Sequence, residues 1–180
     1  MKKITLYDKS FRTFIPNEEI EKAIDKIASK INEEYKDCGD IPVILCTLNG
    51  AMMFTSELLK RFDFDCEVVS TKLSSYDGTR STGVVRQVMG LTGDLTGKRV
   101  LIVEDIVDTG NTIVDLMKIV REKGAKDCKV CTMLLKPEVY SKDVVLDFVA
   151  MEIPNRFIVG FGLDYNELGR NYKDIYVLDE

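Results

Sequence analysis

The sequence predicts an α/β fold in which a mostly parallel, doubly wound sheet is flanked by helices. Residues 43–48 and 100–103 are almost entirely apolar and too short for helices, which is typical of strands buried on both faces. Segments with apolar residues at helical spacing lie between such runs. Strands that alternate with helices in this way predict a parallel α/β sheet.

The elements can be placed in order along the chain. The first helix follows Pro16, with Asn17 as its expected N-cap, and ends before Gly39. The Asn49-Gly50 pair ends the first strand. The further elements that we expect are a helix at 52–62, strands at 66–71, 84–89 and 100–103, a turn at 91–97, a helix that ends at Gly124 and a strand at 129–135.

Two regions depart from this alternation. Residues 73–83 are crowded with Ser, Thr, Gly, Asp and Arg, and so long a polar stretch is typical of either a lid or a disordered segment. Residues 147–178 show short strand-like pieces, which we place partly at the sheet edge and partly in a small flap. We expect a single domain, residues 1–180. Its core is about residues 17–150, and the N-terminal segment and about residues 151–180 form a hood.

Composition excludes several classes of function. The chain of 180 residues has no histidine, which removes Ser-His-Asp triads and histidine-bearing metal sites. The net charge is −5, and no basic run suggests extended nucleic-acid binding. Every apolar run is shorter than the roughly 20 residues of a membrane span. We therefore expect a cytoplasmic protein that binds neither extended nucleic acid nor membranes.

The cysteines do not suggest disulfides or redox chemistry. There are five of them, an odd number. Cys128 and Cys131 match C-x-x-C, but the strand-like segment around them differs from the helix starts at which redox motifs occur. Residues three apart on a strand point to opposite faces. We therefore interpret both thiols as core residues.

One strand-to-helix junction concentrates the polar chemistry. Ligands of open α/β sheets collect beyond the carboxyl ends of strands, where residues 100–103 are followed by three carboxylates and a Thr-Gly-Asn-Thr turn. Backbone N–H groups at a helix N-terminus, a glycine and two hydroxyls suit a phosphate monoester. Carboxylates repel phosphate and instead suit a sugar diol or Mg²⁺. Together these groups predict a site for a ribose 5-phosphate.

Two other interpretations compete for this junction. Asp108 is a common kind of N-cap for a solvated turn. Asp108-Thr109-Gly110 also matches the aspartic-protease tripeptide, but those enzymes need a second copy or a symmetric dimer, and here the tripeptide opens a helix. The whole run of residues 100–112 favours the phosphate-sugar site.

That run, VLIVEDIVDTGNT, resembles the phosphoribosyl pyrophosphate (PRPP) motif of type I phosphoribosyltransferases. Lys136 and the segment EIPNRFIVGFGLDYNELGRN at residues 152–171 are similar to the hypoxanthine and hypoxanthine-guanine members of that family. With residues 48–50 and 74–76, the resemblance covers about residues 40–178. It implies the type I phosphoribosyltransferase fold with a small hood, and a purine salvage enzyme.

The resemblance also implies roles for individual residues. Asp108 would be the general acid/base at purine N7, Lys136 would bind the 6-oxo group, and Phe157 would stack on the ring. Tyr165 and Tyr172 we interpret as packing residues. The implied ribose and 5-phosphate residues are Glu104, Asp105, Ile106, Val107, Asp108, Thr109, Gly110, Asn111 and Thr112. The implied pyrophosphate residues are Leu48, Asn49, Gly50 and Arg170, the purine residues Lys136, Arg156, Phe157, Ile158 and Asp164, the Mg²⁺ ligand Asp164, and the lid residues Ser75 and Tyr76.

The pyrophosphate loop departs from the family pattern at one position. In the family, the loop that corresponds to residues 48–50 contains a non-proline cis peptide. Many relatives have lysine where this chain has Asn49. With that cation missing, PRPP binding would depend more on Arg170 and Mg²⁺.

The implied reaction transfers the 5-phosphoribosyl group of PRPP to N9 of hypoxanthine, and of guanine if it is accepted. The products are IMP or GMP and pyrophosphate, the implied partners are PRPP and a 6-oxopurine, and the implied assembly is a homodimer or homotetramer. Two alternatives remain open. A xanthine- or pyrimidine-directed enzyme of the same fold is disfavoured by Lys136, and an RNA-binding regulator by the net charge of −5.

Overall fold

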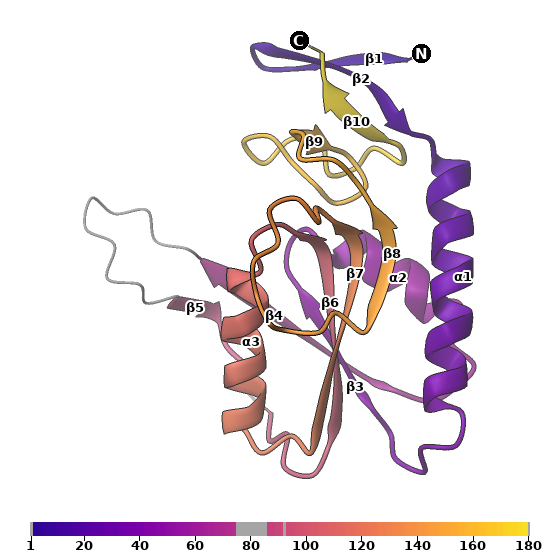
Figure 1. The fold of residues 1–180 in the computed structure, drawn as a ribbon, viewed down its shortest axis with the longest axis vertical. Coiled ribbons are helices and arrows are strands. Elements are labelled where there is room, and N and C mark those ends of the chain that lie inside the picture. Colours follow the sequence, from indigo (N-terminus) through magenta and orange to yellow (C-terminus); the bar gives the residue numbers. More distant parts are fainter. Residues whose placement is uncertain (1, 75–85, 92, 180) are drawn as a thin grey trace.

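A central sheet forms the larger part of the computed structural model (Figure 1). The structure describes residues 2–74, 86–91 and 93–179, and within them this sheet has six strands. Neighbouring strands are parallel, except for an antiparallel pair at one edge. In spatial order they are β5 (Arg86–Met89), β4 (Glu67–Ser74), β3 (Val43–Thr47), β6 (Arg99–Val107), β7 (Asp127–Leu135) and β8 (Phe148–Glu152). The predicted mostly parallel sheet is confirmed.

Helices cover both faces of this sheet. On β6, Leu101 and Val103 pack in the cluster under two of the helices, while Val100 and Ile102 pack in the cluster under the third. Because successive strand residues point to opposite faces, a strand covered on both sides must be apolar throughout. The helices are α1 (Asn17–Tyr35) and α2 (Met52–Leu59) on one face and α3 (Asn111–Glu122) on the other (Figure 1).

A second, antiparallel sheet forms a hood above the core (Figure 1). Its order within the described residues is β1 (Lys3–Leu6), β2 (Lys9–Ile15), β10 (Ile175–Leu178) and β9 (Ile158–Val159). The first and last segments of the chain pair here, so both termini lie in the hood (Figure 1). The hood itself was predicted, but we predicted no strand before Pro16.

The start of α1 joins the hood to the core. Pro16, not Asn17, is the N-cap, so the prediction of Asn17 as the cap was wrong. Proline has no side-chain acceptor to offer, and the Asn17 N–H instead donates to Asp174 Oδ1 at 2.9 Å. The other Asp174 oxygen accepts from the Tyr176 hydroxyl at 3.2 Å. A residue from the far end of the chain therefore caps the first helix.

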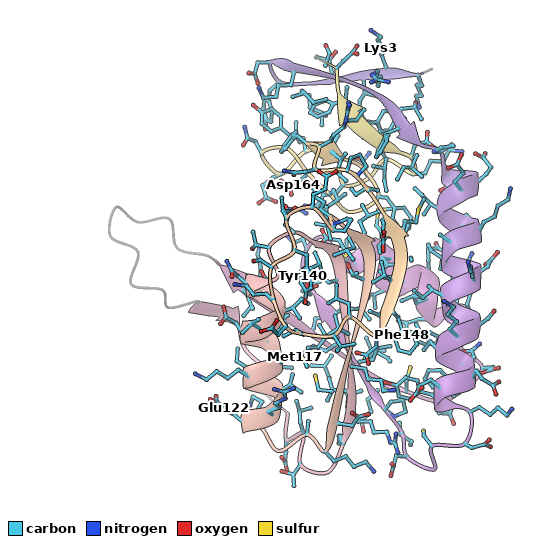
Figure 2. All side chains as sticks on the ribbon, in the orientation of Figure 1. Lys3, Met117, Glu122, Tyr140, Phe148 and Asp164 are labelled. Carbon is cyan, nitrogen blue, oxygen red and sulfur yellow. The ribbon has the colours of Figure 1, made fainter. Side chains whose placement is uncertain are left out.

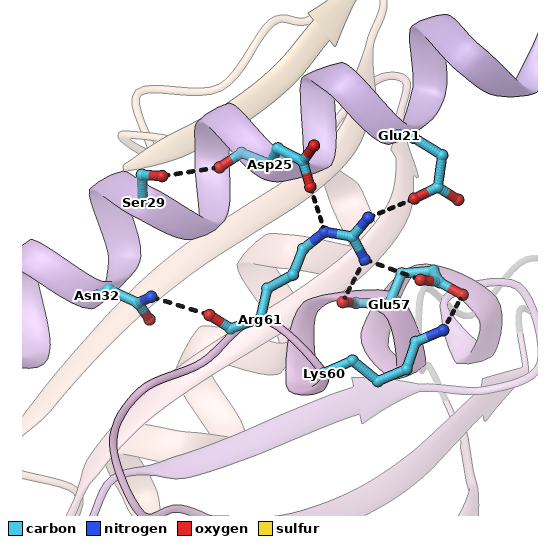
Figure 3. Close-up of polar contacts among 7 residues, drawn as sticks. All are labelled: Glu21, Asp25, Ser29, Asn32, Glu57, Lys60 and Arg61. Carbon is cyan, nitrogen blue, oxygen red and sulfur yellow. Dashed lines mark hydrogen bonds and ion pairs between the residues drawn. The ribbon is translucent and has the colours of Figure 1, made fainter.

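Arg61 ties α1 to α2 on the same face of the sheet (Figure 3). Its Nε donates to Asp25 at 2.5 Å, its Nη1 donates to the Glu57 carboxylate at 2.8 Å, and its Nη2 contacts Glu21. Asn32 donates to the Arg61 backbone carbonyl at 2.9 Å. The Arg61 side chain is 22% exposed, whereas its partner Asp25 is 65% exposed, so the network joins the two helices at the edge of the protein surface.

The two cysteines of the C-x-x-C pair lie on opposite faces of β7, as predicted. Cys131 is buried in the cluster under α1, and Cys128 packs against the cluster under α3. Burial raises the pKa of the Cys128 thiol to about 12, and burial also raises that of Cys131. All five cysteines lie in the described residues and are free. In the described part of the chain, no helix is both long and apolar enough to cross a membrane.

Candidate active site

The predicted phosphate-sugar junction lies where β6 leads into α3. We predicted that Glu104 and Asp105 follow the strand. That prediction was wrong, because β6 extends to Val107 and both residues lie within it. Their pairing with β7 continues the parallel ladder past the apolar part of the strand. Residues 104–113 line a pocket of about 290 Å³, which contains all nine residues predicted for the ribose and 5-phosphate.

The opening turn of α3 offers backbone N–H groups to this pocket. Gly110 is the N-cap, and its φ of +85° is a conformation that glycine adopts without strain. A Cβ at this position would lie 2.6 Å from a ring carbon of Tyr140. Among the described residues no side chain caps α3, so the N–H groups of its first turn remain available to an anion.

Glu104 and Asp105 form a close acidic pair at the base of the pocket. Burial, then repulsion by Asp105, raises the pKa of Glu104 well above its ordinary value. Burial also raises the pKa of Asp105, although its carboxylate accepts the Ile106 N–H at 2.9 Å. Glu104 Oε2 is enclosed and has no hydrogen-bond partner within the described ranges. Glu104 Oε2 therefore lacks a partner, which a ligand hydroxyl or a cation would supply.

Lys136 and Asp108 form an ion pair beside this turn. The Lys136 N–H donates to the Val107 carbonyl at 3.0 Å, and this bond brings the end of β7 next to the end of β6. Lys136 Nζ lies 3.1 Å from Asp108 Oδ1 and 3.3 Å from Oδ2. Lys136 is 8% exposed, whereas the Asp108 side chain is 52% exposed. A buried cation thus holds an accessible carboxylate.

The loop of residues 48–50 packs tightly against the acidic pair. The Leu48–Asn49 peptide bond is cis, as expected from the family resemblance. A Cβ on Gly50 would lie 1.7 Å from Asp105 Oδ2, and a Cβ on Gly162 would lie 2.0 Å from the Gly50 carbonyl oxygen. Both glycines are therefore required by close approach. We did not assign Gly162 a role from the sequence, although its place between two site segments and its lack of a side chain were available signals.

Arg170 and Asp164 form a second ion pair in the hood. Arg170 Nη2 lies 2.6 Å from Asp164 Oδ1, and its Nη1 donates to the Gly162 carbonyl at 2.8 Å. Asp164 Oδ2 accepts the Glu167 N–H at 2.8 Å. Arg170 Nε is buried without a partner among the described residues. Asp164 lies in the hood on the side that meets the core (Figure 2).

The hood also carries the aromatic residue predicted to stack on a base. Phe157 is 46% exposed, and its ring centroid lies 6.1 Å from that of Phe11 and 5.8 Å from that of Tyr165. Ile158 is buried in β9 beside it, whereas Arg156 is exposed in the preceding loop. The predicted lid residues Ser75 and Tyr76 lie outside the described residues.

Comparison with known proteins identifies the family. Residues 13–166 match the model of the phosphoribosyl transferase domain. The hypoxanthine-guanine phosphoribosyltransferase of Streptococcus pneumoniae is 37% identical over 170 residues, which are 94% of this chain and 93% of that protein. The hypoxanthine-guanine-xanthine phosphoribosyltransferase of Tritrichomonas foetus is 35% identical over 182 residues, 100% of this chain and 98% of that protein.

Solved structures give the same result. The hypoxanthine phosphoribosyl transferase of Trypanosoma cruzi superposes with a TM-score of 0.88 at 31% identity, over 98% of this chain and 95% of that one. The hypoxanthine-guanine phosphoribosyltransferase of Bacillus anthracis superposes with a TM-score of 0.86 at 31% identity, over 93% of this chain and 98% of that one. The chain therefore belongs to the phosphoribosyltransferase family and, within it, to the hypoxanthine(-guanine) phosphoribosyltransferases.

Proposed function

We propose that this enzyme transfers the 5-phosphoribosyl group of PRPP to N9 of hypoxanthine, and of guanine, with release of pyrophosphate. The observation that carries the proposal is the Lys136–Asp108 ion pair beside the opening turn of α3. A 6-oxopurine presents O6, an acceptor, next to N7 on one edge of the ring. An ammonium donor 3.1 Å from a carboxylate acceptor matches that edge when N7 carries a proton.

The sugar and its phosphate would occupy the pocket at the junction. Backbone N–H groups and hydroxyls from Thr109 to Thr112 would bind the 5-phosphate, since a helix N-terminus favours an anion. Glu104 and Asp105 would accept hydrogen bonds from the ribose hydroxyls. The unpartnered Glu104 Oε2 supports this role, because a buried acceptor without a donor is costly until a ligand supplies one.

The base and the pyrophosphate would lie toward the hood. Phe157 would stack on the purine, and the Ile158 backbone and Arg156 would contact its edge. The N–H groups of residues 48–50 would face the pyrophosphate, together with Arg170. Because position 49 is asparagine and not lysine, Arg170 is the cation that we assign to the pyrophosphate. The Arg170 Nε is buried without a partner among the described residues, which is consistent with an acceptor from the ligand binding there.

Mg²⁺ fits this set of residues as a partner of the substrate. The described residues contain no cluster of three or more acidic, cysteine or histidine side chains that could hold a metal alone. Mg²⁺ commonly binds through one or two carboxylates together with substrate phosphates and water. Asp164 would be such a carboxylate, and Glu104 and Asp105 offer others. Bound there, Mg²⁺ would neutralise charge that develops on the departing pyrophosphate.

The protein groups then have distinct tasks in the reaction. Arg170 stabilises negative charge on the leaving pyrophosphate as the bond to the ribose carbon lengthens. Purine N9 attacks that carbon while Lys136 holds O6. Asp108 accepts the proton from N7, and Lys136 beside it stabilises the carboxylate until that transfer. The lid predicted at residues 73–83 would exclude water from the electron-poor ribose carbon.

Substrate profiling tests the proposal. The purified protein is incubated with PRPP, Mg²⁺ and hypoxanthine, guanine, xanthine, adenine or uracil in turn, and nucleotide and pyrophosphate are measured. We expect IMP and GMP to form rapidly and adenine and uracil to be inert. Turnover confined to xanthine or uracil would overturn the choice of base. A complex with IMP should place its phosphate against residues 108–112, and the expected homodimer or homotetramer can be checked by sedimentation.

A further inference from the structure

Tyr165 connects the start of the chain to the ring proposed to stack on the base. Its ring meets Phe157 edge-on, with centroids 5.8 Å apart and planes at 88°. Its hydroxyl donates to Asp8 Oδ1 at 2.8 Å. Asp8 lies in the turn between β1 and β2, 157 residues earlier in the sequence. A carboxylate from the N-terminal hairpin thus holds a ring in the C-terminal part of the hood.

The same hairpin surrounds the Tyr165 ring on other sides. The Tyr7 ring lies edge-on at 6.1 Å, and Lys9 Nζ lies 5.6 Å from the Tyr165 centroid. Phe11, which is fully buried, contacts both Tyr165, at 6.3 Å, and Phe157, at 6.1 Å. Phe157 is therefore held by Phe11 and Tyr165 while almost half of its surface stays open to a ligand.

We propose that Tyr165 is a positioning residue for the purine: held by Asp8, it fixes the Phe157 ring in the orientation on which the base stacks. The inference rests on the proposed function and adds the N-terminal hairpin to the base site. An aromatic ring that is ordered before binding does not lose rotamer freedom when the base arrives, so more of the stacking energy remains as affinity.

The hydrogen bond between Tyr165 and Asp8 is chemically suited to hold the Tyr165 ring in one position. The hydrogen bond raises the pKa of the Tyr165 phenol and lowers that of the Asp8 carboxyl. Near neutral pH a phenol is a donor and a carboxylate an acceptor, as the 2.8 Å contact between them requires. Because both groups are accessible to water, we expect a modest effect on base affinity and no effect on the sugar-phosphate pocket.

Tyr172 provides a matched control in the same hood. Its ring packs edge-on against the ring of Tyr176 in β10, with the two centroids 5.5 Å apart. The sequence suggested the same packing role for both tyrosines. The structure separates them, because of these two tyrosines only Tyr165 makes a ring contact with Phe157 within the described residues. Tyr172→Phe therefore makes the same chemical change without touching the proposed support.

The experiment compares Tyr165→Leu, Tyr165→Phe, Asp8→Asn, the double variant Asp8→Asn/Tyr165→Phe and Tyr172→Phe. Steady-state kinetics give kcat and the KM for hypoxanthine and for PRPP. Calorimetric titration gives the affinities for IMP, which has the base, and for ribose 5-phosphate, which lacks it. Thermal unfolding checks that each variant is folded.

We expect Tyr165→Leu to raise the KM for hypoxanthine about tenfold and to lower the affinity for IMP by a similar factor. Tyr165→Phe removes the hydrogen bond and should cause about a threefold change, whereas Asp8→Asn keeps a weaker, neutral acceptor and should cause a smaller change in the same direction. The double variant should do no more than Tyr165→Phe alone, because both substitutions act on the same hydrogen bond. The PRPP KM, the ribose 5-phosphate affinity and the Tyr172→Phe enzyme should stay within about twofold of wild type.

Equal losses for IMP and ribose 5-phosphate, or unchanged hypoxanthine kinetics in Tyr165→Phe and Asp8→Asn, would overturn the positioning role. If Tyr165→Leu does not fold, the two milder variants still decide the question, since they keep every ring in place. A wild-type enzyme that neither converts hypoxanthine nor binds IMP would instead refute the proposed function, so the two failures are distinguishable.

Discussion

The two halves of the candidate site are built differently. The ribose-phosphate half comes from one continuous stretch, residues 104–112, at a single strand-to-helix junction. The base and pyrophosphate half combines Lys136 with residues 48–50 and 157–170, which are supported by contacts across the chain. Substitutions in the first half should therefore act directly on a bound group, whereas many in the second half should act through neighbouring residues.

The largest effect is expected at Asp108, where the two halves meet. Asp108→Asn keeps the size of the side chain but removes the carboxylate proposed to take the N7 proton. We expect kcat to fall by about 10²- to 10⁴-fold, with little change in PRPP binding. Steady-state kinetics and PRPP titration measure the two quantities. Full activity in this variant would remove Asp108 from its assigned role.

Lys136→Ala tests the base half. It removes the O6 donor and leaves Asp108 without its cation. We expect hypoxanthine kcat/KM to fall by about 10- to 100-fold, and discrimination against adenine to weaken. Ribose 5-phosphate affinity should change little, since the α3 turn is intact. Unchanged hypoxanthine kinetics would mean that this lysine has only a structural role.

Glu104→Gln should weaken ligand binding and stabilise the free protein. Burial and Asp105 raise the pKa of Glu104, so between its ordinary value and that raised value the folded protein binds more protons than the unfolded chain. The free energy of unfolding of the wild type therefore falls as pH rises through this interval.

Glutamine does not titrate, so in Glu104→Gln the part of the pH dependence of the unfolding free energy that comes from Glu104 should disappear. Above the interval we expect a melting temperature about 2 to 5 °C higher than that of the wild type. Ribose 5-phosphate affinity should fall about tenfold, because a charged acceptor is lost. Melting curves across pH with parallel titrations measure both. A lower melting temperature at every pH would contradict the cost that we attribute to the buried acid pair.

The smallest effect concerns the joint between hood and core. Asp174→Ala removes the cap of α1, and we expect a loss of about 1 kcal/mol in the free energy of unfolding. Chemical denaturation measures this change. Because the Asp174 side chain bonds to Asn17 and Tyr176, which belong to neither half of the site, kcat should stay near wild type. A large fall in activity without a loss of stability would show that the joint controls the site directly.

The fold and the ribose-phosphate half were largely predictable from the sequence. The runs around Leu45 and Ile102 are apolar on both pleats because each strand is covered on both faces. The turn at Gly110 is recognisable because its glycine and hydroxyls are adjacent in the chain. The predicted end of the strand before this turn was less accurate, because backbone pairing with β7 extends β6 past the apolar residues to Val107.

The hood was much harder to predict. The contacts of Tyr165 with Asp8 and of Asp174 with α1 each span 157 residues, and no local pattern indicates them. Gly162 differs in that it lies between two predicted site segments, but the reason that it must be glycine is tertiary, because the Gly50 carbonyl oxygen lies against it.

By itself, the sequence determined most strands and helices of the core and the strand-to-helix junction proposed for a phosphate, because these depend on periodicity and on neighbouring backbone groups. Only the tertiary structure decided which carboxylate oxygen is buried without a partner, which lysine pairs with Asp108 and which tyrosine contacts Phe157. The physical reason is distance along the chain. Burial, ion pairing and ring contacts arise between residues that become neighbours only when the hood and the core have folded together.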